Sequence, residues 1–84
     1  MSLDHLVLGC ELHENFGVSK EALIALGPDC AVRDVIELVV SATNQKDELI
    51  FREIARILNT RLNVDAEICW ESRLVADLWL GRFD

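Results

Sequence analysis

The chain has 84 residues with an apolar fraction of 51%, which suits one small domain with a single core and leaves no room for a second. Its formal net charge of −7 makes nucleic acid a poor partner, because phosphate binding needs concentrated positive charge, and favours basic protein surfaces instead. The apolar runs are too short for a membrane span, and the N-terminus lacks the pattern of a secretory signal, so we expect a cytoplasmic protein.

The first predicted element is a helix from Ser2 to Phe16. Ser2 can cap its start, and Gly17 can end it through a backbone conformation that glycine adopts freely. No Lys or Arg precedes Lys20, so the charged residues of this helix are acidic. We expect its inward face to carry Leu3, Leu6, Val7 and Cys10.

A short helix over Lys20–Leu26 follows, capped by Ser19 and closed by Gly27 and Pro28. Seven residues are too few for a helix to persist without tertiary packing. We therefore expect this helix to lie against its neighbours.

Two longer helices have the clearest patterns. From Val32 to Val40 the apolar residues recur with the i, i+3, i+4, i+7, i+8 spacing of one helical face, and Glu48–Leu62 repeats the pattern. The polar run "TNQKD" at 43–47 is short enough to join two antiparallel helices.

The remainder, residues 63–84, mixes apolar and charged residues without a clean period. We expect it to be irregular in secondary structure but folded over the bundle through its apolar side chains. These are Ile68, Trp70, Leu74, Val75, Leu78 and Trp79.

Taken in rotated order, these segments resemble the acyl carrier proteins, small acidic four-helix domains that hold acyl groups as thioesters on a 4'-phosphopantetheine arm. "SLD" followed by apolar Leu6 and Leu8 resembles the family's second helix, which opens with the modified serine of an Asp-Ser-Leu motif. "FGVSKEAL" resembles the approach to the third helix, and "CAVRDVIELV" resembles the fourth. "EIARILNTRLNVDAEI" then resembles the first helix, and "SRLVADL" resembles the run that precedes the modified serine.

The resemblance implies an all-α, four-helix acyl-carrier-like bundle with circularly permuted connectivity, as one domain over residues 1–84. Residues 1–42 resemble the family's C-terminal half, 43–47 form the linker, and 48–84 resemble the N-terminal half. The expected cut lies between Asp84 and Ser2, since "RFD" joined to "SLD" would restore Asp-Ser-Leu. Asp84 and Ser2 are then expected to lie close together in a monomer. Alternatively, a second chain completes the Asp-Ser-Leu motif in a swapped dimer.

The resemblance also implies the function, a carrier for fatty-acid or polyketide-type synthesis that is not itself an enzyme. Ser2 would hold the covalent 4'-phosphopantetheine, at a helix N-terminus that favours negative charge. Asp4, Glu11 and Glu14 would meet the basic surfaces of a phosphopantetheinyl transferase and of acyl-handling enzymes. The alternative is an acyl-carrier-like interaction module that is not modified, in which Ser2 serves only as a helix cap.

Other sites are less well supported by the residues. His5 and His13 lie roughly 80° apart around a helix, so we expect surface histidines rather than a metal pair. Cys30 follows "LGPD", which resembles the approach to the family's serine, but no serine stands at that position. A nucleophilic pair of Cys10 and His13 lacks a third orienting residue, so we expect Cys10 in the core. Three unpaired cysteines suit reduced thiols better than a disulfide or a zinc site.

Overall fold

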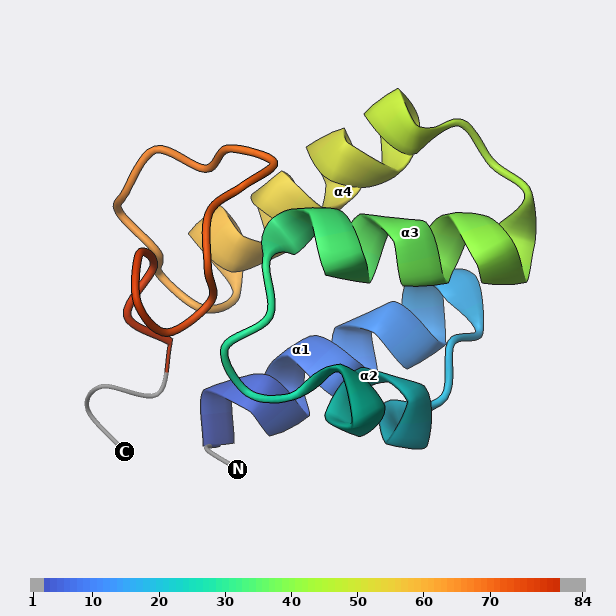
Figure 1. The fold of residues 1–84 in the computed structure, drawn as a ribbon, viewed down its shortest axis with the longest axis horizontal. Helices are drawn as coiled ribbons and strands as arrows, with labels where there is room; N and C mark the ends of the chain where they lie inside the picture. Colours follow the sequence, from blue (N-terminus) through green and yellow to red (C-terminus); the bar gives the residue numbers. More distant parts are fainter. Residues whose placement is uncertain (1–2, 81–84) are drawn as a thin grey trace.

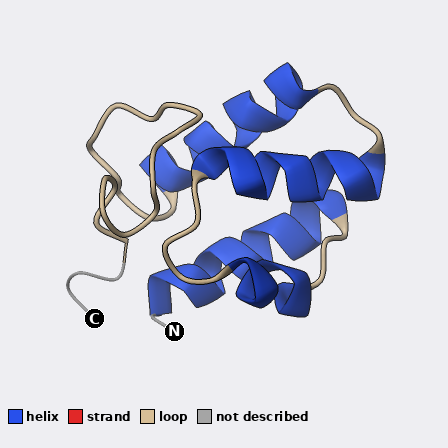
Figure 2. Ribbon diagram, in the orientation of Figure 1, coloured by secondary structure: helices blue, strands red, loops and turns tan. Residues whose placement is uncertain are grey.

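The computed structural model describes residues 3–80, which form four helices around a single core (Figure 1). The helices are α1 (Leu3–Phe16), α2 (Lys20–Leu26), α3 (Val32–Thr43) and α4 (Asp47–Thr60). Within the described residues there is no strand (Figure 2). An isolated antiparallel bridge joins Ala31 to Arg73. The predicted all-α, four-helix bundle is therefore confirmed. Among residues 3–80, no helix combines the length and the apolar character needed to cross a lipid bilayer.

Caps that the sequence predicts set several of the helix boundaries. Ser19 Oγ accepts a hydrogen bond from the Ala22 N–H at 3.2 Å, which satisfies a donor left without a partner at the start of α2. Gly17 and Gly27 follow α1 and α2 with φ values of 72° and 90°, which glycine adopts without steric cost. Ser2, the predicted cap of α1, lies outside the described residues.

Helices α3 and α4 form an antiparallel hairpin (Figure 1). Residues 44–46 connect them, one residue shorter at each end than the predicted linker. Asn44 ends α3 with φ 59°, a left-handed conformation that asparagine tolerates, and its N–H donates to the Val40 carbonyl at 2.8 Å. The short linker thus holds the two longest apolar patterns of the sequence against each other.

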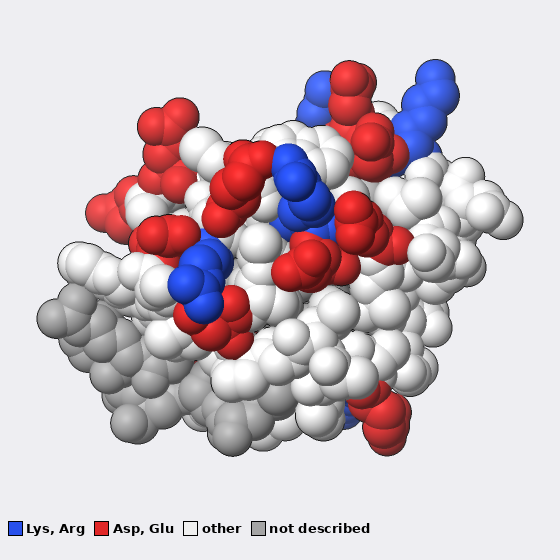
Figure 3. All heavy atoms as spheres, viewed as in Figure 1, with Lys and Arg blue, Asp and Glu red and all other residues white. Residues whose placement is uncertain are grey.

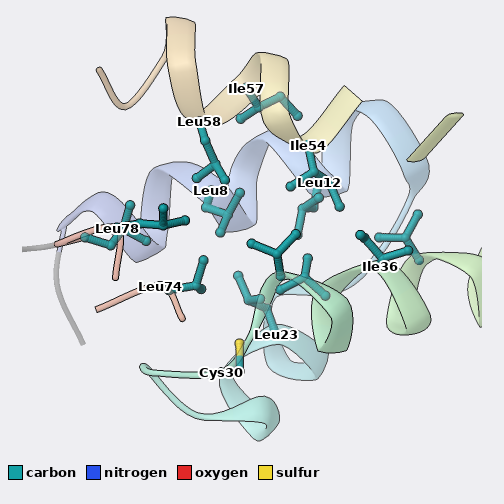
Figure 4. Close-up of a cluster of buried hydrophobic side chains, with 14 of the residues drawn as sticks. Leu8, Leu12, Leu23, Cys30, Ile36, Ile54, Ile57, Leu58, Leu74 and Leu78 are labelled. Carbon is teal, nitrogen blue, oxygen red and sulfur yellow. The ribbon is translucent and has the colours of Figure 1, made fainter. Parts of the chain in front are cut away.

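One core joins the four helices to the segment that follows α4. Leu74 and Leu78 reach it from that segment and lie beside Leu8 of α1, while α4 contributes Leu58 and its isoleucines from the other side (Figure 4). Each such side chain stabilises the fold by roughly 1.5–3 kcal/mol through burial alone. Among residues 3–80, the largest fully buried side chains are Leu8, Leu12, Val32, Val35, Ile36, Val39, Ile50, Ile54, Ile57, Leu58 and Leu74.

The face of α1 that meets the core is not the predicted one. The structure buries His5, Leu8, Gly9 and Leu12. Leu3 and Leu6 are 64% and 47% exposed, and Cys10 is exposed rather than in the core. Apolar residues surround this helix on nearly every side, so its pattern defines no unique inward stripe. The prediction of an inward face was therefore wrong for Leu3, Leu6 and Cys10, while Val7 is half-buried.

His5 helps to fix the rotation of α1. It is buried, contrary to the prediction of a surface histidine, and its Nε2 lies 2.6 Å from the carbonyl oxygen of Pro28. Because a carbonyl can only accept, Nε2 carries the proton and donates it. This bond ties the first turns of α1 to the connection between α2 and α3.

The segment after α4 docks on the start of α3 through backbone hydrogen bonds. The N–H groups of Val32 and Arg33, which have no partner within α3, donate to the carbonyls of Ser72 and Trp70, both at 2.8 Å. The Leu74 N–H donates in return to the Cys30 carbonyl at 3.0 Å. The start of α3 is thus completed by residues that are distant in the sequence.

Asp29 adds a charged group to the same contact. Its Oδ1 accepts the N–H groups of Val75 and Ala76 at 3.0 and 2.9 Å, and its Oδ2 lies 2.8 Å from the Arg73 guanidinium. The pKa of Asp29 is lowered from its ordinary value, chiefly by the hydrogen bond from the Ala76 N–H. The Val75 N–H and the positive charge of Arg73 add to this effect. Arg33 pairs with Glu71 nearby, so acidic and basic side chains interleave on this face (Figure 3).

The residues predicted to fold this segment over the bundle divide into two groups. Leu74 and Leu78 are buried, and Ile68 and Trp70 pack against the core. Trp70 stacks on Phe51 of α4, with ring centroids 5.3 Å apart and planes within 3°. Val75 and Trp79 are 39% and 59% exposed, so the prediction was wrong for these two.

We predict that Asp29→Asn weakens the docked segment and reduces the acid sensitivity of the fold. A carboxyl whose pKa is lowered by folding stabilises the protein above its unfolded pKa and loses that contribution as the pH falls toward the folded value. The urea midpoint of Asp29→Asn should be lower than that of wild type at neutral pH and should change less between about pH 5 and about pH 3. Asp65→Asn, which removes the same charge elsewhere, should follow wild type; equal behaviour of the two variants would contradict this role.

A matched pair of substitutions tests the orientation of α1. Leu8→Ala should lower the free energy of unfolding by about 2–5 kcal/mol because it opens a cavity in the core. Leu6→Ala, on the exposed face, should change it by about 0.5 kcal/mol or less. Urea denaturation followed by circular dichroism measures both, and a larger loss for Leu6→Ala would mean that the helix is rotated.

Candidate functional site

The predicted modification site, Ser2, lies outside the described residues, whereas the first turn of the helix that follows it is described. α1 is described from Leu3, and Asp4 in its first turn lines a pocket of about 590 Å³. Its other lining residues are 62–66, which follow α4, and 77–80. The first turn of α1 therefore adjoins the segment that resembles the approach to the family's modified serine.

The pocket is mostly apolar with a set of acidic groups. Its apolar lining comes from Leu62, Val64, Ala66, Leu78, Trp79 and Leu80. Asp4, Asp65 and Asp77 add three carboxyl groups, and Asn63 adds an amide. Asp77 is also structural, since its Oδ2 accepts the Arg73 N–H at 2.8 Å. Among the described lining residues there is no Lys or Arg.

Two left-handed turns shape the walls of this pocket. Asn63 has φ 54°, and the Val64 N–H after it donates to the Leu58 carbonyl at 2.9 Å. Trp79 has φ 59°, and the Leu80 N–H after it donates to the Leu74 carbonyl at 2.8 Å. Asparagine tolerates this conformation, whereas a bulky side chain is strained in it by roughly 1–3 kcal/mol. Trp79 is thus held in an unfavourable conformation at the rim of the pocket.

The sequence contained little that would have located this pocket. Of the predicted partner-binding residues only Asp4 lines it. Neither wall after α4 has a periodic pattern, so Asp65, Asp77 and Trp79 were not predicted to lie together. A left-handed tryptophan has no sequence signature, because glycine and asparagine are the residues that mark such turns.

The three predicted partner-binding acids of α1 have different surroundings. Glu11 pairs with Arg61 at 3.3 Å and has a side chain only 16% exposed. Glu14 is exposed, while Asp4 is half-buried at the pocket. Glu14 is therefore the acid of the three that is most open to a partner on the outer side of the helix.

An exposed apolar stripe runs along the outer face of α1 instead. Leu3, Leu6 and Cys10 follow the i, i+3, i+7 spacing of one helical face, and all three are exposed. Val7 is half-buried beside them. An apolar stripe with an acidic neighbour is the pattern of a surface that meets other proteins.

The other candidate sites do not assemble. His5 is buried against Pro28 while His13 is exposed, and within residues 3–80 no three His, Cys, Asp or Glu side chains gather where they could hold a metal ion. Cys30 is buried, and burial raises the pKa of its thiol to about 11, with Asp34 and Asp29 adding to the effect. The Cys30 thiol is therefore protonated at neutral pH and unsuited to act as a nucleophile.

A scan against models of protein families, a search of curated proteins and a search of solved structures each found no match to this chain.

We predict that Trp79→Gly is more stable than Trp79→Ala by about 1–2 kcal/mol. Both substitutions remove the indole, but only alanine keeps the β-carbon that makes a left-handed conformation costly. Thermal or urea unfolding of the two variants isolates this difference. Equal stabilities would show that the turn at residue 79 is not left-handed or relaxes freely.

Proposed function

We propose that this chain is an acyl carrier protein with rotated segment order, whose Ser2 holds acyl groups through a 4'-phosphopantetheine arm. The observation that carries the proposal is the pocket shared by Asp4 and residues 77–80. In this pocket Asp4, in the first turn of α1, lies next to residues 77–80, and residues 72–78 resemble the approach to the family's modified serine. In a carrier of ordinary order these two pieces are continuous.

The hairpin of α3 and α4 supports the same reading. These helices resemble the family's fourth and first helices, which are antiparallel, and here they are antiparallel neighbours joined by residues 44–46. A linker of this length can join the two only if their ends lie close together. The short connection at residues 44–46 thus supports the proposed permutation at the place where the family's two chain ends would be joined.

The chemistry at the start of α1 suits the proposed modification. A helix N-terminus presents free N–H groups and the positive end of the helix dipole, and both favour the phosphodiester that would form on Ser2. The serine would act as an acceptor of the arm and not as a catalyst. The acyl group would then be carried on the terminal thiol of the arm.

The outer face of α1 offers a surface for the enzymes that would handle the cargo. Leu3 and Leu6 supply exposed apolar contacts, and Glu14 lies on the same side of the helix. A partner with basic residues around an apolar centre would complement this face, and the net charge of −7 would steer its approach. Such partners are a phosphopantetheinyl transferase and acyl-handling enzymes, which a monomer would meet in the cytoplasm.

The second candidate function is an interaction module that is not modified. The exposed Leu3 and Leu6 favour it, because they provide a docking surface whether or not Ser2 bears an arm. In this case Ser2 only caps α1, and the fold of a carrier is used for binding alone.

Incubation with a promiscuous phosphopantetheinyl transferase and coenzyme A, followed by mass spectrometry, separates the two functions. Wild type should gain one phosphopantetheine, and Ser2→Ala should gain none. Ser41→Ala, which removes an exposed serine of α3, should be modified like wild type. No gain on wild type would favour the interaction module, and an equal gain on Ser2→Ala would refute Ser2 as the acceptor.

A further inference from the structure

We propose that residues 70–76 form a lid over the start of α3, and that this lid opens while the helices stay folded and thereby exposes the buried thiol of Cys30. The lid is held by contacts with the turn before α3 and with the first residues of that helix. The proposal does not rest on the carrier function, because none of these contacts involves Ser2 or α1.

The polar contacts described between the lid and the bundle lie close together. Two N–H groups at the start of α3 donate to carbonyls of the lid, and the Cys30 carbonyl accepts a hydrogen bond from it. Asp29 accepts two of its N–H groups and pairs with Arg73. A second ion pair, between Arg33 and Glu71, crosses the same boundary. Because these contacts are neighbours on one short stretch of chain, they break together when the lid opens.

The helices keep a core of their own in the open state. Leu12 of α1 and Ile54 of α4 are fully buried and belong to a cluster to which each helix contributes side chains. Opening exposes Leu74, which is 1% exposed in the closed form, and separates the ring of Trp70 from that of Phe51. The open state is therefore a minor one, of the kind that local opening produces in segments without regular secondary structure.

Cys30 reports the position of the lid. Its side chain is 8% exposed and lies at the edge of the core, and burial raises the pKa of its thiol to about 11 (Figure 4). Its carbonyl accepts the Leu74 N–H at 3.0 Å, and the two side chains belong to the same core cluster. The thiol is thus protonated and shielded under the closed lid, whereas opening brings it to solvent and to thiol reagents.

Labelling of the Cys10→Ser/Cys69→Ser protein tests the proposal, because both substituted cysteines are exposed and Cys30 is then the only one in the sequence. Dithiodipyridine, an uncharged disulfide, forms a mixed disulfide with Cys30 and releases one thiopyridone, which takes up the thiol proton and is followed by its absorbance. At urea concentrations where circular dichroism shows folded helices, the labelling rate should change little, because a local opening exposes little surface. A rate that rises from the start with the full urea dependence of global unfolding would overturn the proposal.

Two matched variants in the same background test the role of Asp29. Asp29→Asn weakens the bonds to the two lid N–H groups and to Arg73, so Cys30 should be labelled several-fold faster while the helical spectrum is unchanged. Glu67→Gln also removes one negative charge, from an exposed residue outside the lid, and should be labelled like its parent. Unchanged labelling of Asp29→Asn would show that Cys30 reacts without opening of the lid, and equal acceleration in both variants would assign the effect to net charge. Either result would contradict the proposal.

Discussion

The docking of residues 70–76 on the start of α3 is the constraint on which the rest of the structure depends. A helix begins with N–H groups that have no partner within it, and here the carbonyls of Ser72 and Trp70 accept two of them. Asp29, just before α3, also holds this segment by accepting two of its backbone N–H groups and pairing with Arg73. A segment with no regular secondary structure thereby acquires a defined position.

That position determines what lies next to α1. With the segment fixed at Asp29, Leu74 and Leu78 enter the core beside Leu8, and the chain turns back at Trp79. Residues 77–80 then become one wall of the pocket whose other walls are Asp4 and residues 62–66. The pocket that Asp4 shares with residues 62–66 and 77–80 is therefore a consequence of one set of backbone hydrogen bonds.

Sequence patterns predicted the parts of this protein that depend on local chemistry. The helical spacing of apolar residues from Val32 onward placed α3 correctly, and the Ser19 cap placed α2. Each signal depends only on residues within a turn or two of one another. The inward face of α1 was not predictable from its period, since apolar residues surround the helix and contacts made by other elements select the buried side. The contacts of Asp29 could not be predicted from local sequence either. Asp29 lies in the turn before α3, and its partners Val75 and Ala76 are 46 and 47 residues away in the sequence.

The candidate site likewise combines a part that local sequence signals indicate with a part that depends on contacts between distant segments. The resemblance selected the start of α1 and its acids as the candidate site, whereas the pocket that Asp4 lines combines three segments that no periodicity connects. Trp79 occupies a turn that sequence rules assign to glycine or asparagine, so its place at the rim could not be anticipated.

The central claim, that the segments are those of an acyl carrier protein in rotated order, is tested most directly by restoring the ordinary order. In such a chain Asp84 is joined to Ser2, and new ends are opened within residues 44–46. The account predicts a helical spectrum like that of the present chain and transfer of phosphopantetheine to the serine of the rejoined Asp-Ser-Leu. A rejoined chain that does not fold, or one that folds and is not modified, would contradict it.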